Sequence, residues 1–233
     1  SFNLFLPFTH RYFFKFYASI CLMDPVLSII FQIIVLLFSV VIHEVSHGLM
    51  ANSLGDPTAK NLGRLTLNPI KHLDFFGSIL LPLFTFFAGG FVFGYAKPVP
   101  YNPYNLRDRK FGPAKVAIAG PISNIIIALI FGLALRFLPA ILDATLLPIL
   151  FSFIVLLNLV LVVFNLMPIP PLDGHWLLLT FVPDRFYQFK RFFIRYGLIL
   201  FFFFVIFIFP LLFPIIKFLF RIIVGKELGA LLF

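Results

Sequence analysis

Long apolar stretches dominate the pattern of hydrophobic and polar positions along this chain of 233 residues. Four of them are close to the roughly 20 residues that a helix needs to cross a bilayer. They lie at residues 25–50, 113–137, 146–166 and 196–218. Runs such as residues 201–209 are apolar on every side of a helix, which suits contact with lipid. The pattern therefore predicts an all-α polytopic membrane protein.

A fifth apolar stretch, residues 75–95, is interrupted by residues that weaken a regular helix, namely Gly77, Pro82, Gly89, Gly90 and Gly94. It could cross the membrane, or it could enter and return to the same side, for instance as a β-hairpin. If it returns, twelve of the 18 Lys and Arg residues lie on one side of the membrane. That distribution gives a better cytoplasmic bias than a full crossing does.

Composition also indicates that a membrane is the solvent. Hydrophobic residues make up 61% of the chain and charged residues 12%, whereas a soluble domain has about 25% charged residues. The net charge of +9 is spread between the apolar stretches and forms no basic and aromatic platform, so we expect no nucleic-acid partner. The basic loops instead indicate membrane orientation and contact with anionic headgroups of the lipid bilayer.

The chain shows neither an internal repeat nor a low-complexity linker, which predicts one membrane-embedded domain over residues 1–233. Within it we expect a three-helix core at about residues 25–180 and an accessory helix at about residues 196–218. Residues 1–22 have too broken an apolar pattern for a span. They are interpreted as an interfacial arm or as non-native residues upstream of Met23.

The strongest chemical signal is the run His43-Glu44-Val45-Ser46-His47, near the end of the first long apolar stretch. Histidines four positions apart lie on one face of a helix, so both imidazoles can bind one metal ion. Glu44 lies at the edge of that face, where it can accept a proton from an attacking water and pass it to the leaving amine. An unpartnered carboxylate is costly in so apolar a helix, which favours a functional cluster over an ordinary helix face.

A catalytic zinc ion usually has three protein ligands, so two histidines are not enough. Asp173 differs from the other acidic residues because it directly follows a long apolar stretch. Three prolines within residues 168–171 stop the preceding helix, and Gly174 permits close approach of the chain or of a substrate. Irregular backbone at membrane depth is tolerated beside a water-filled cavity. His43, His47 and Asp173 are therefore the predicted ligands of Zn²⁺.

A metal ion shared by His47 and Asp173 also constrains the topology. If residues 75–95 crossed the membrane, the two ligands would lie on opposite sides of a hydrocarbon layer about 30 Å thick. They can share one ion only if that stretch returns to the side from which it came. The metal site and the charge distribution thus both predict a membrane re-entrant segment.

With these motifs the sequence resembles the site-2 protease family of intramembrane metalloproteases, specifically its small members without a PDZ or CBS module. The resemblance covers most of residues 23–200. It rests on four segments that occur in order, namely His43 to Gly48, residues 68–82, Gly120-Pro-Ile-Ser-Asn124, and the run from Asn165 to Gly174.

The resemblance implies that His43, His47 and Asp173 bind zinc and that Glu44 is the catalytic base, which agrees with the assignment from spacing. It further implies that Asn124 and Asn165 lie near the substrate strand, although an Asn in a membrane helix also often bonds only a neighbouring helix. His175 stands where the family more often has a small residue, and its role stays open between a contact to the site and an interfacial side chain.

The function that the resemblance implies is intramembrane proteolysis, the zinc-dependent hydrolysis of a peptide bond in a transmembrane segment of a membrane-tethered substrate. We expect a multi-pass protein of a prokaryotic cytoplasmic membrane with its active site toward the cytoplasmic side, and we leave a regulatory membrane partner open. One alternative is a non-proteolytic metal-binding membrane protein such as a divalent-ion transporter, in which Glu44 has no role. Another is an inactive relative that chaperones membrane segments, against which the complete set of chemical residues argues.

Overall fold

The computed structural model describes residues 25–81, 83–84, 97–138 and 146–225. The predicted interfacial arm, residues 1–22, lies outside the described residues, and so does much of the predicted re-entrant stretch. Helices account for most of the described part, and no strand occurs in it. The prediction of an all-α protein is thereby confirmed for the described residues.

Four helices are long and apolar enough to cross a membrane within the described part. Three are regular, namely α2 (Pro25–Ser53), α5 (Gly112–Phe137) and α7 (Leu147–Asn165). The fourth, Gly197–Val224, is built from α10 (Gly197–Phe203), the π-helix η5 (Phe204–Ile208), the 3-10 helix η6 (Phe209–Leu212) and α11 (Phe213–Val224). The four predicted apolar helices are confirmed, and their ends differ from the predicted ones by at most six residues.

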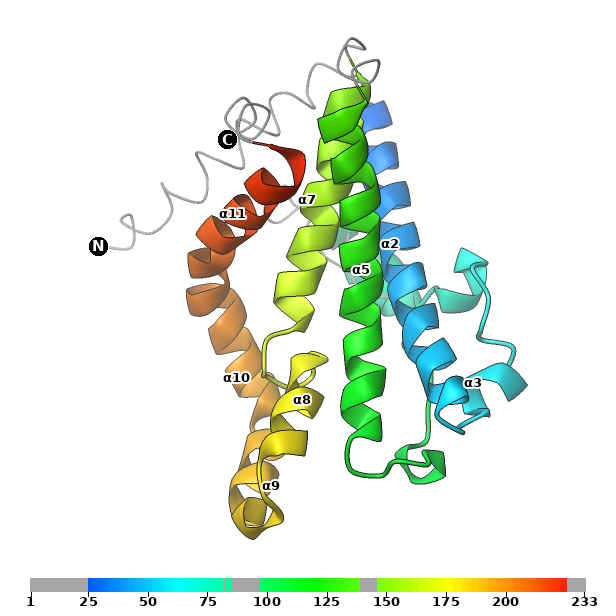
Figure 1. Ribbon diagram of the computed structural model, residues 1–233, viewed down its shortest axis with the longest axis vertical. Coiled ribbons are helices and arrows are strands. Elements are labelled where there is room, and N and C mark those ends of the chain that lie inside the picture. The colour runs from blue at the N-terminus through cyan, green and yellow to red at the C-terminus, as the bar shows by residue number, and fades with distance from the viewer. Residues whose placement is uncertain (1–24, 82, 85–96, 139–145, 226–233) are drawn as a thin grey trace.

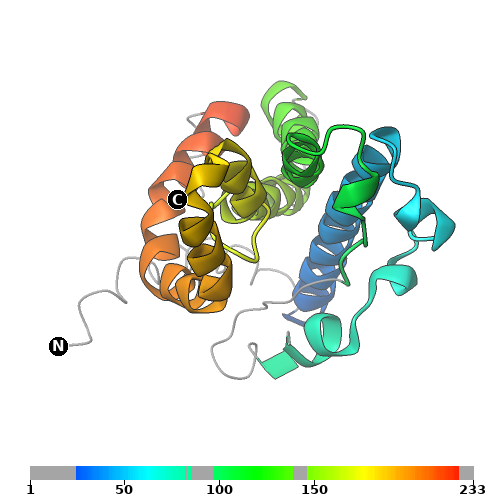
Figure 2. The ribbon, with the colours of Figure 1, turned by 90° about the horizontal axis from the view of Figure 1, so that it is seen from below.

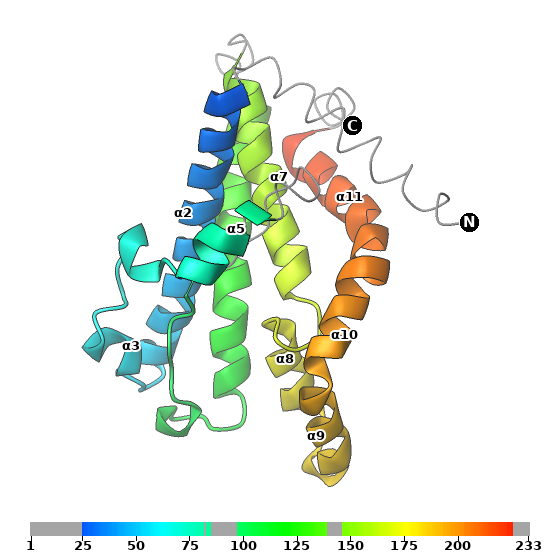
Figure 3. The ribbon, with the colours of Figure 1, turned by 180° about the vertical axis from the view of Figure 1, so that it is seen from behind.

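The long helices alternate in direction, and this arrangement brings the end of α2 and the start of α5 to the same end of the molecule (Figure 1). The segment between them therefore makes no net crossing. It contains α3 (Thr58–Asn61), η1 (Pro69–His72), the π-helix η2 (Phe75–Leu80) and η3 (Pro103–Asn105). Figures 1 and 3 place η2, drawn in teal, at about the middle of the length of α2.

This geometry agrees with a segment that dips toward the middle of the spans and returns. The first part of residues 75–95 is helical, so the hairpin-like form suggested for this stretch is not seen there. Asp74 caps the start of η2 by accepting a hydrogen bond from the backbone N–H of Gly77 at 2.7 Å. Residues 85–96 lie outside the described part, which leaves the returning half a prediction.

The main apolar core joins α5, α7 and α11. Ile216, Phe220 and Val224 recur every four residues along α11 and are buried against α5 and α7. Gly132 of α5 permits this packing, because an added Cβ there would collide with a methyl group of Ile223. The fourth span therefore continues to Val224, six residues beyond the predicted end, because its last turns complete the core.

Short elements close the end of the bundle at which α2 ends. They are α8 (Gly174–Phe181), η4 (Asp184–Phe186) and α9 (Tyr187–Arg195), and Figure 2 shows them between α7 and α10 when the bundle is seen from below. Gly197, at the start of α10, lies against the ring of Pro170, so that an added Cβ would be 2.5 Å from it. The start of α10 thus packs against the loop after α7 at Pro170.

Candidate metal centre

The α2 helix carries His43, Glu44 and His47 on its last turns before the chain leaves the span. The two imidazoles are almost buried, with 5% and 8% of each residue exposed. Candidate ligand atoms of the three side chains lie within 4.8 Å of one another, close enough for one metal ion. The spacing of this motif predicted such a cluster, and the helix forms it as expected.

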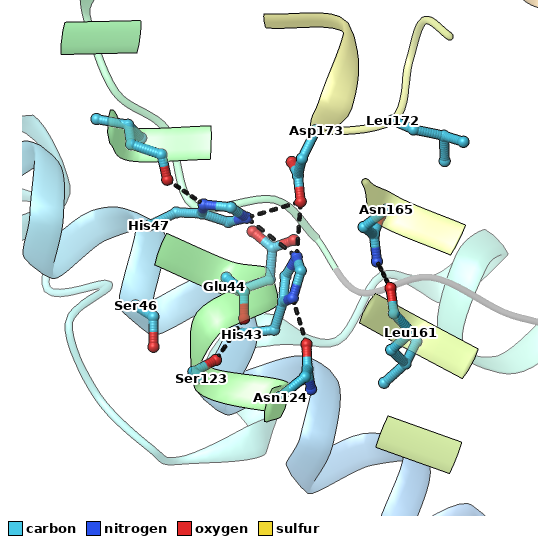
Figure 4. A network of polar contacts seen from close by, with 12 residues as sticks. His43, Glu44, Ser46, His47, Ser123, Asn124, Leu161, Asn165, Leu172 and Asp173 are labelled. Atoms are coloured by element: carbon cyan, nitrogen blue, oxygen red, sulfur yellow. Dashed lines mark hydrogen bonds and ion pairs between the residues drawn. The ribbon is translucent and has the colours of Figure 1, made fainter. Parts of the chain in front are cut away.

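The loop after α7 brings Asp173 onto both histidines (Figure 4). Its Oδ2 atom lies 3.0 Å from His43 Nε2 and 3.2 Å from His47 Nε2. The two Nε2 atoms are 3.0 Å apart. Three candidate ligand atoms, from residues up to 130 positions apart in the sequence, therefore converge on one point. Two imidazole nitrogens and a carboxylate oxygen form a donor set that suits zinc.

The other ring nitrogens of the two histidines are bound to the α5 helix. His47 Nδ1 lies 2.7 Å from the carbonyl oxygen of Val116, and His43 Nδ1 lies 2.6 Å from Asn124 Oδ1. Since a carbonyl oxygen can only accept, Nδ1 of each ring carries the proton and donates it. In a neutral ring this leaves the lone pair on Nε2, directed at the point where the ligand atoms converge.

Gly120 of α5 provides the room in front of the two histidines. A Cβ added at this position would lie 2.5 Å from His47 Nε2 and 2.6 Å from His43 Nε2. Any side chain would therefore occupy the place where a metal ion would bind. The side chains packed against Gly120 are thus two of the predicted metal ligands.

Glu44 is held by the extended segment that precedes α5. The backbone N–H of Val99 donates to Glu44 Oε2 at 2.8 Å. Val99 lies between Pro98 and Pro100, which have no N–H, and Pro100 favours an extended conformation for the preceding Val99. Arg64 donates to the carbonyl oxygen of Lys97 at 2.9 Å and so anchors the same segment. One carboxylate oxygen of Glu44 thus accepts a hydrogen bond from this segment. No sequence pattern indicated this contact.

The carboxylate of Asp173 is kept ionised by its neighbours. Burial raises the pKa of Asp173, but its hydrogen-bond contacts with His43 and His47 lower it, and the net pKa is below the usual range. An ionised carboxylate and two imidazoles with free Nε2 lone pairs are the forms that bind zinc. The residues present therefore fit a zinc ion.

The two asparagines predicted to contact substrate differ in their surroundings. Asn124 is fully buried and bonded to His43. Asn165 is partly exposed beside Asp173 in Figure 4, and its amide donates to the carbonyl oxygen of Leu161 at 3.0 Å. Their substrate contacts stay predictions. His175 directs Nδ1 toward the carbonyl oxygen of Leu172 at 2.6 Å, and its ring packs against that of Trp176 in a tilted arrangement.

The sequence profile of Peptidase family M50 matches residues 31–146 and 139–209. The chain belongs to peptidase family M50. It is a zinc metalloprotease of this family, which is also the site-2 protease family, and its helices make it a multi-pass membrane protein. The resemblance noted in the sequence is thereby confirmed.

Relatives with curated descriptions agree with membership of the M50 family. The chain is 42% identical over 161 residues to YwhC of Bacillus subtilis, described as a zinc metalloprotease, which covers 66% of this chain and 69% of that protein. It is 33% identical over 144 residues to Rip2 of Mycolicibacterium smegmatis and 31% identical over 143 residues to Rip2 of Mycobacterium tuberculosis. The chain spans about half the length of the Rip2 relatives, 52% in each case. No solved structure gave a significant match.

Proposed function

We propose that this zinc metalloprotease hydrolyses a peptide bond in a transmembrane segment of a membrane-tethered substrate, with His43, His47 and Asp173 as zinc ligands and Glu44 as the base. The observation that carries the proposal is the convergence of two Nε2 atoms and Asp173 Oδ2 within 3.2 Å of one another. These atoms come from a membrane helix and from a loop that ends another one. Candidate ligands on a membrane span and on the loop that directly follows another span favour a substrate that is itself embedded in the membrane.

Bound zinc would polarise the scissile carbonyl and acidify the attacking water. Glu44 then takes the proton of that water as its oxygen bonds to the carbonyl carbon. Because Oε2 of Glu44 is occupied by the Val99 N–H, the proton goes to Oε1. Glu44 returns this proton to the amide nitrogen as the C–N bond breaks, so that an amine and a carboxylic acid leave.

The active site is proposed to lie toward the cytoplasmic side. The end of the bundle that carries Asp173 also carries α9, a short amphipathic helix with Lys190, Arg191 and Arg195. Its aromatic side chains are exposed, for example 55% for Phe192. A basic amphipathic helix of this kind lies at the level of lipid headgroups, and positive residues favour the cytoplasmic face.

The substitution Glu44→Gln tests the assignment of base and ligands together. The purified variant should bind one zinc ion per chain and lose cleavage of a model transmembrane substrate by at least about 100-fold, because a base contributes about 10²–10⁴. Ser46→Ala is a matched control, since Ser46 lies between the same two ligands and its hydroxyl only donates to the carbonyl oxygen of Ile42 at 2.7 Å. Wild-type turnover by the Glu44→Gln protein would refute the proposed role.

The same protein in vesicles separates a protease from an ion carrier. A protease should cleave the substrate and move no zinc across the bilayer, and substitution of Glu44 should leave zinc uptake at the background value. Asn165→Ala adds a test of the predicted substrate contact. It should raise KM while the zinc content stays at that of the wild type.

A further inference from the structure

A chain of buried polar side chains joins three helices and ends on His43. Asn124 of α5 and Asn158 of α7 are fully buried, and Ser39 of α2 is 3% exposed. Asn124 Oδ1 lies 2.6 Å from His43 Nδ1. Asn124 Nδ2 donates to Asn158 Oδ1 at 2.8 Å, and Asn158 Nδ2 donates to Ser39 Oγ at 3.0 Å. Unpaired amides would be costly in this apolar setting, so the chain depends on each link.

Two backbone carbonyl groups fix the direction of the chain. The carbonyl oxygen of Ile154 lies 2.8 Å from Asn158 Nδ2, and that of Ser39 lies 3.3 Å from Asn124 Nδ2. Because a carbonyl oxygen only accepts, each amide must turn its nitrogen toward it. The oxygen of Asn158 then faces Asn124, and the oxygen of Asn124 faces His43. Every link therefore donates away from the metal centre.

This direction has a consequence for the ring of His43. An acceptor at Nδ1 requires the proton on Nδ1, and a neutral imidazole then has its lone pair on Nε2. A reversed Asn124 amide would instead present N–H groups to Nδ1 and favour the wrong tautomer. The amide of Asn158 opposes this reversal, because it offers an oxygen to the Asn124 nitrogen.

We propose that Asn158 and Ser39, acting through Asn124, are positioning residues for His43, and that they hold the ring in the orientation and tautomer in which Nε2 binds zinc. The inference rests on the proposed role of His43 as a zinc ligand. Under this proposal α7 contributes to the metal centre through Asn158, although none of the proposed ligands lies within Leu147–Asn165. Partners that orient a histidine ligand typically change metal affinity by about 10–100-fold when they are removed.

Zinc affinity of the purified full chain, measured by competition with a chromogenic chelator, tests the proposal. Asn124→Leu should weaken zinc binding by about 10–100-fold, and Asn158→Leu, one link further away, by about 10-fold. Ser152→Ala is the matched control on α7. Ser152 is also fully buried, and its hydroxyl has no hydrogen-bond partner in the described part of the chain. The zinc affinity of the Ser152→Ala protein should therefore stay within about twofold of the wild-type value.

The unfolding midpoint of the metal-free proteins separates positioning from helix packing. If Asn158→Leu lowers only this midpoint and keeps wild-type zinc affinity, the side chain merely joins helices and the inference is wrong. Should Asn124→Leu fail to fold, Asn124→Asp keeps an acceptor for His43 and should bind zinc within about threefold of the wild type. His43→Ala is measured alongside, because wild-type affinity in that variant would overturn the ligand assignment itself.

Discussion

The substitution Gly120→Ala offers the sharpest test of the metal centre, because it adds one methyl group at a known place. The new Cβ would lie 2.5 Å from His47 Nε2 and 2.6 Å from His43 Nε2. Heavy atoms of this kind approach to about 3.5 Å, so either the ring nitrogens or the α5 backbone must move by about 1 Å. Gly120 directly precedes Pro121 inside α5, so the added Cβ also meets the proline ring, and zinc affinity has to be measured separately from stability.

Zinc sites tolerate ligand displacements of about 0.2 Å, well below this shift. Each ring is also anchored at Nδ1 to α5, so it cannot withdraw without breaking a buried hydrogen bond. We therefore expect Gly120→Ala to weaken zinc binding by at least about 100-fold. This is the largest loss of metal affinity typically seen when a residue that orients a ligand is removed. Cleavage should fall in parallel.

Zinc content after dialysis and chelator competition measure the effect, and thermal unfolding of the metal-free protein measures the fold. Gly132→Ala on the same helix is the matched control. Its Cβ would collide with Ile223 of α11, far from the ligands, so it should lower stability and keep the zinc affinity. If Gly120→Ala binds zinc as tightly as the wild type, the space in front of Gly120 is not the metal site.

Three further predictions follow from individual contacts. Gly174→Ala should destabilise the protein by about 2 kcal/mol or more in denaturant unfolding, because its Cβ would collide with the backbone carbonyl oxygens of Leu166 and Met167, which cannot move aside. Asp173→Asn should lose bound zinc while Glu44→Gln retains it, and equal loss in both would show that Glu44 is a ligand. Hydrogen bonds from Thr58, Asn105 and Asn102 lower the pKa of Asp56 although burial raises it. A lowered folded-state pKa stabilises the fold above the unfolded value of about 3.9, and this contribution is lost as the pH falls through the folded pKa. Asp56→Asn should therefore reduce the free energy of unfolding at pH 7 by about 1–3 kcal/mol and have a smaller effect near pH 3.

The spans and the histidine pair could be predicted from the sequence because both are local patterns. An apolar stretch of sufficient length forms a helix in lipid whatever surrounds it, and a spacing of four brings two side chains to one helix face. Asp173 required one further argument, that a zinc ion needs a third ligand. The ends of the spans were predicted less well where packing decides them, as in the extension of the fourth span to Val224.

Contacts between distant segments could not be predicted in this way. Nothing in the sequence places the N–H of Val99 on Glu44 or Gly120 against the two histidines, since both depend on how α2, α5 and the extended segment pack. Asp56 is another example. This residue is fully buried and accepts hydrogen bonds that join the end of α2 to the turn before α5, and nothing in its sequence surroundings indicates these partners.

The anchoring of both rings also bears on how metal binding and folding are related. In small zinc domains the ligands converge only when the metal binds, and the chain is unfolded without it. Here Nδ1 of His43 and Nδ1 of His47 are each hydrogen-bonded to α5, and none of the proposed ligands belongs to the core of α5, α7 and α11. The proposed ligands are thus held by contacts of the fold as well as by any bound metal, and a bound zinc ion would stabilise the fold by about 2.7 kcal/mol at a concentration 100 times Kd. Under the proposed function this anchoring would keep the two rings in place when a substrate strand enters, because α5 holds both rings and Asn158 of α7 supports Asn124, the partner of His43.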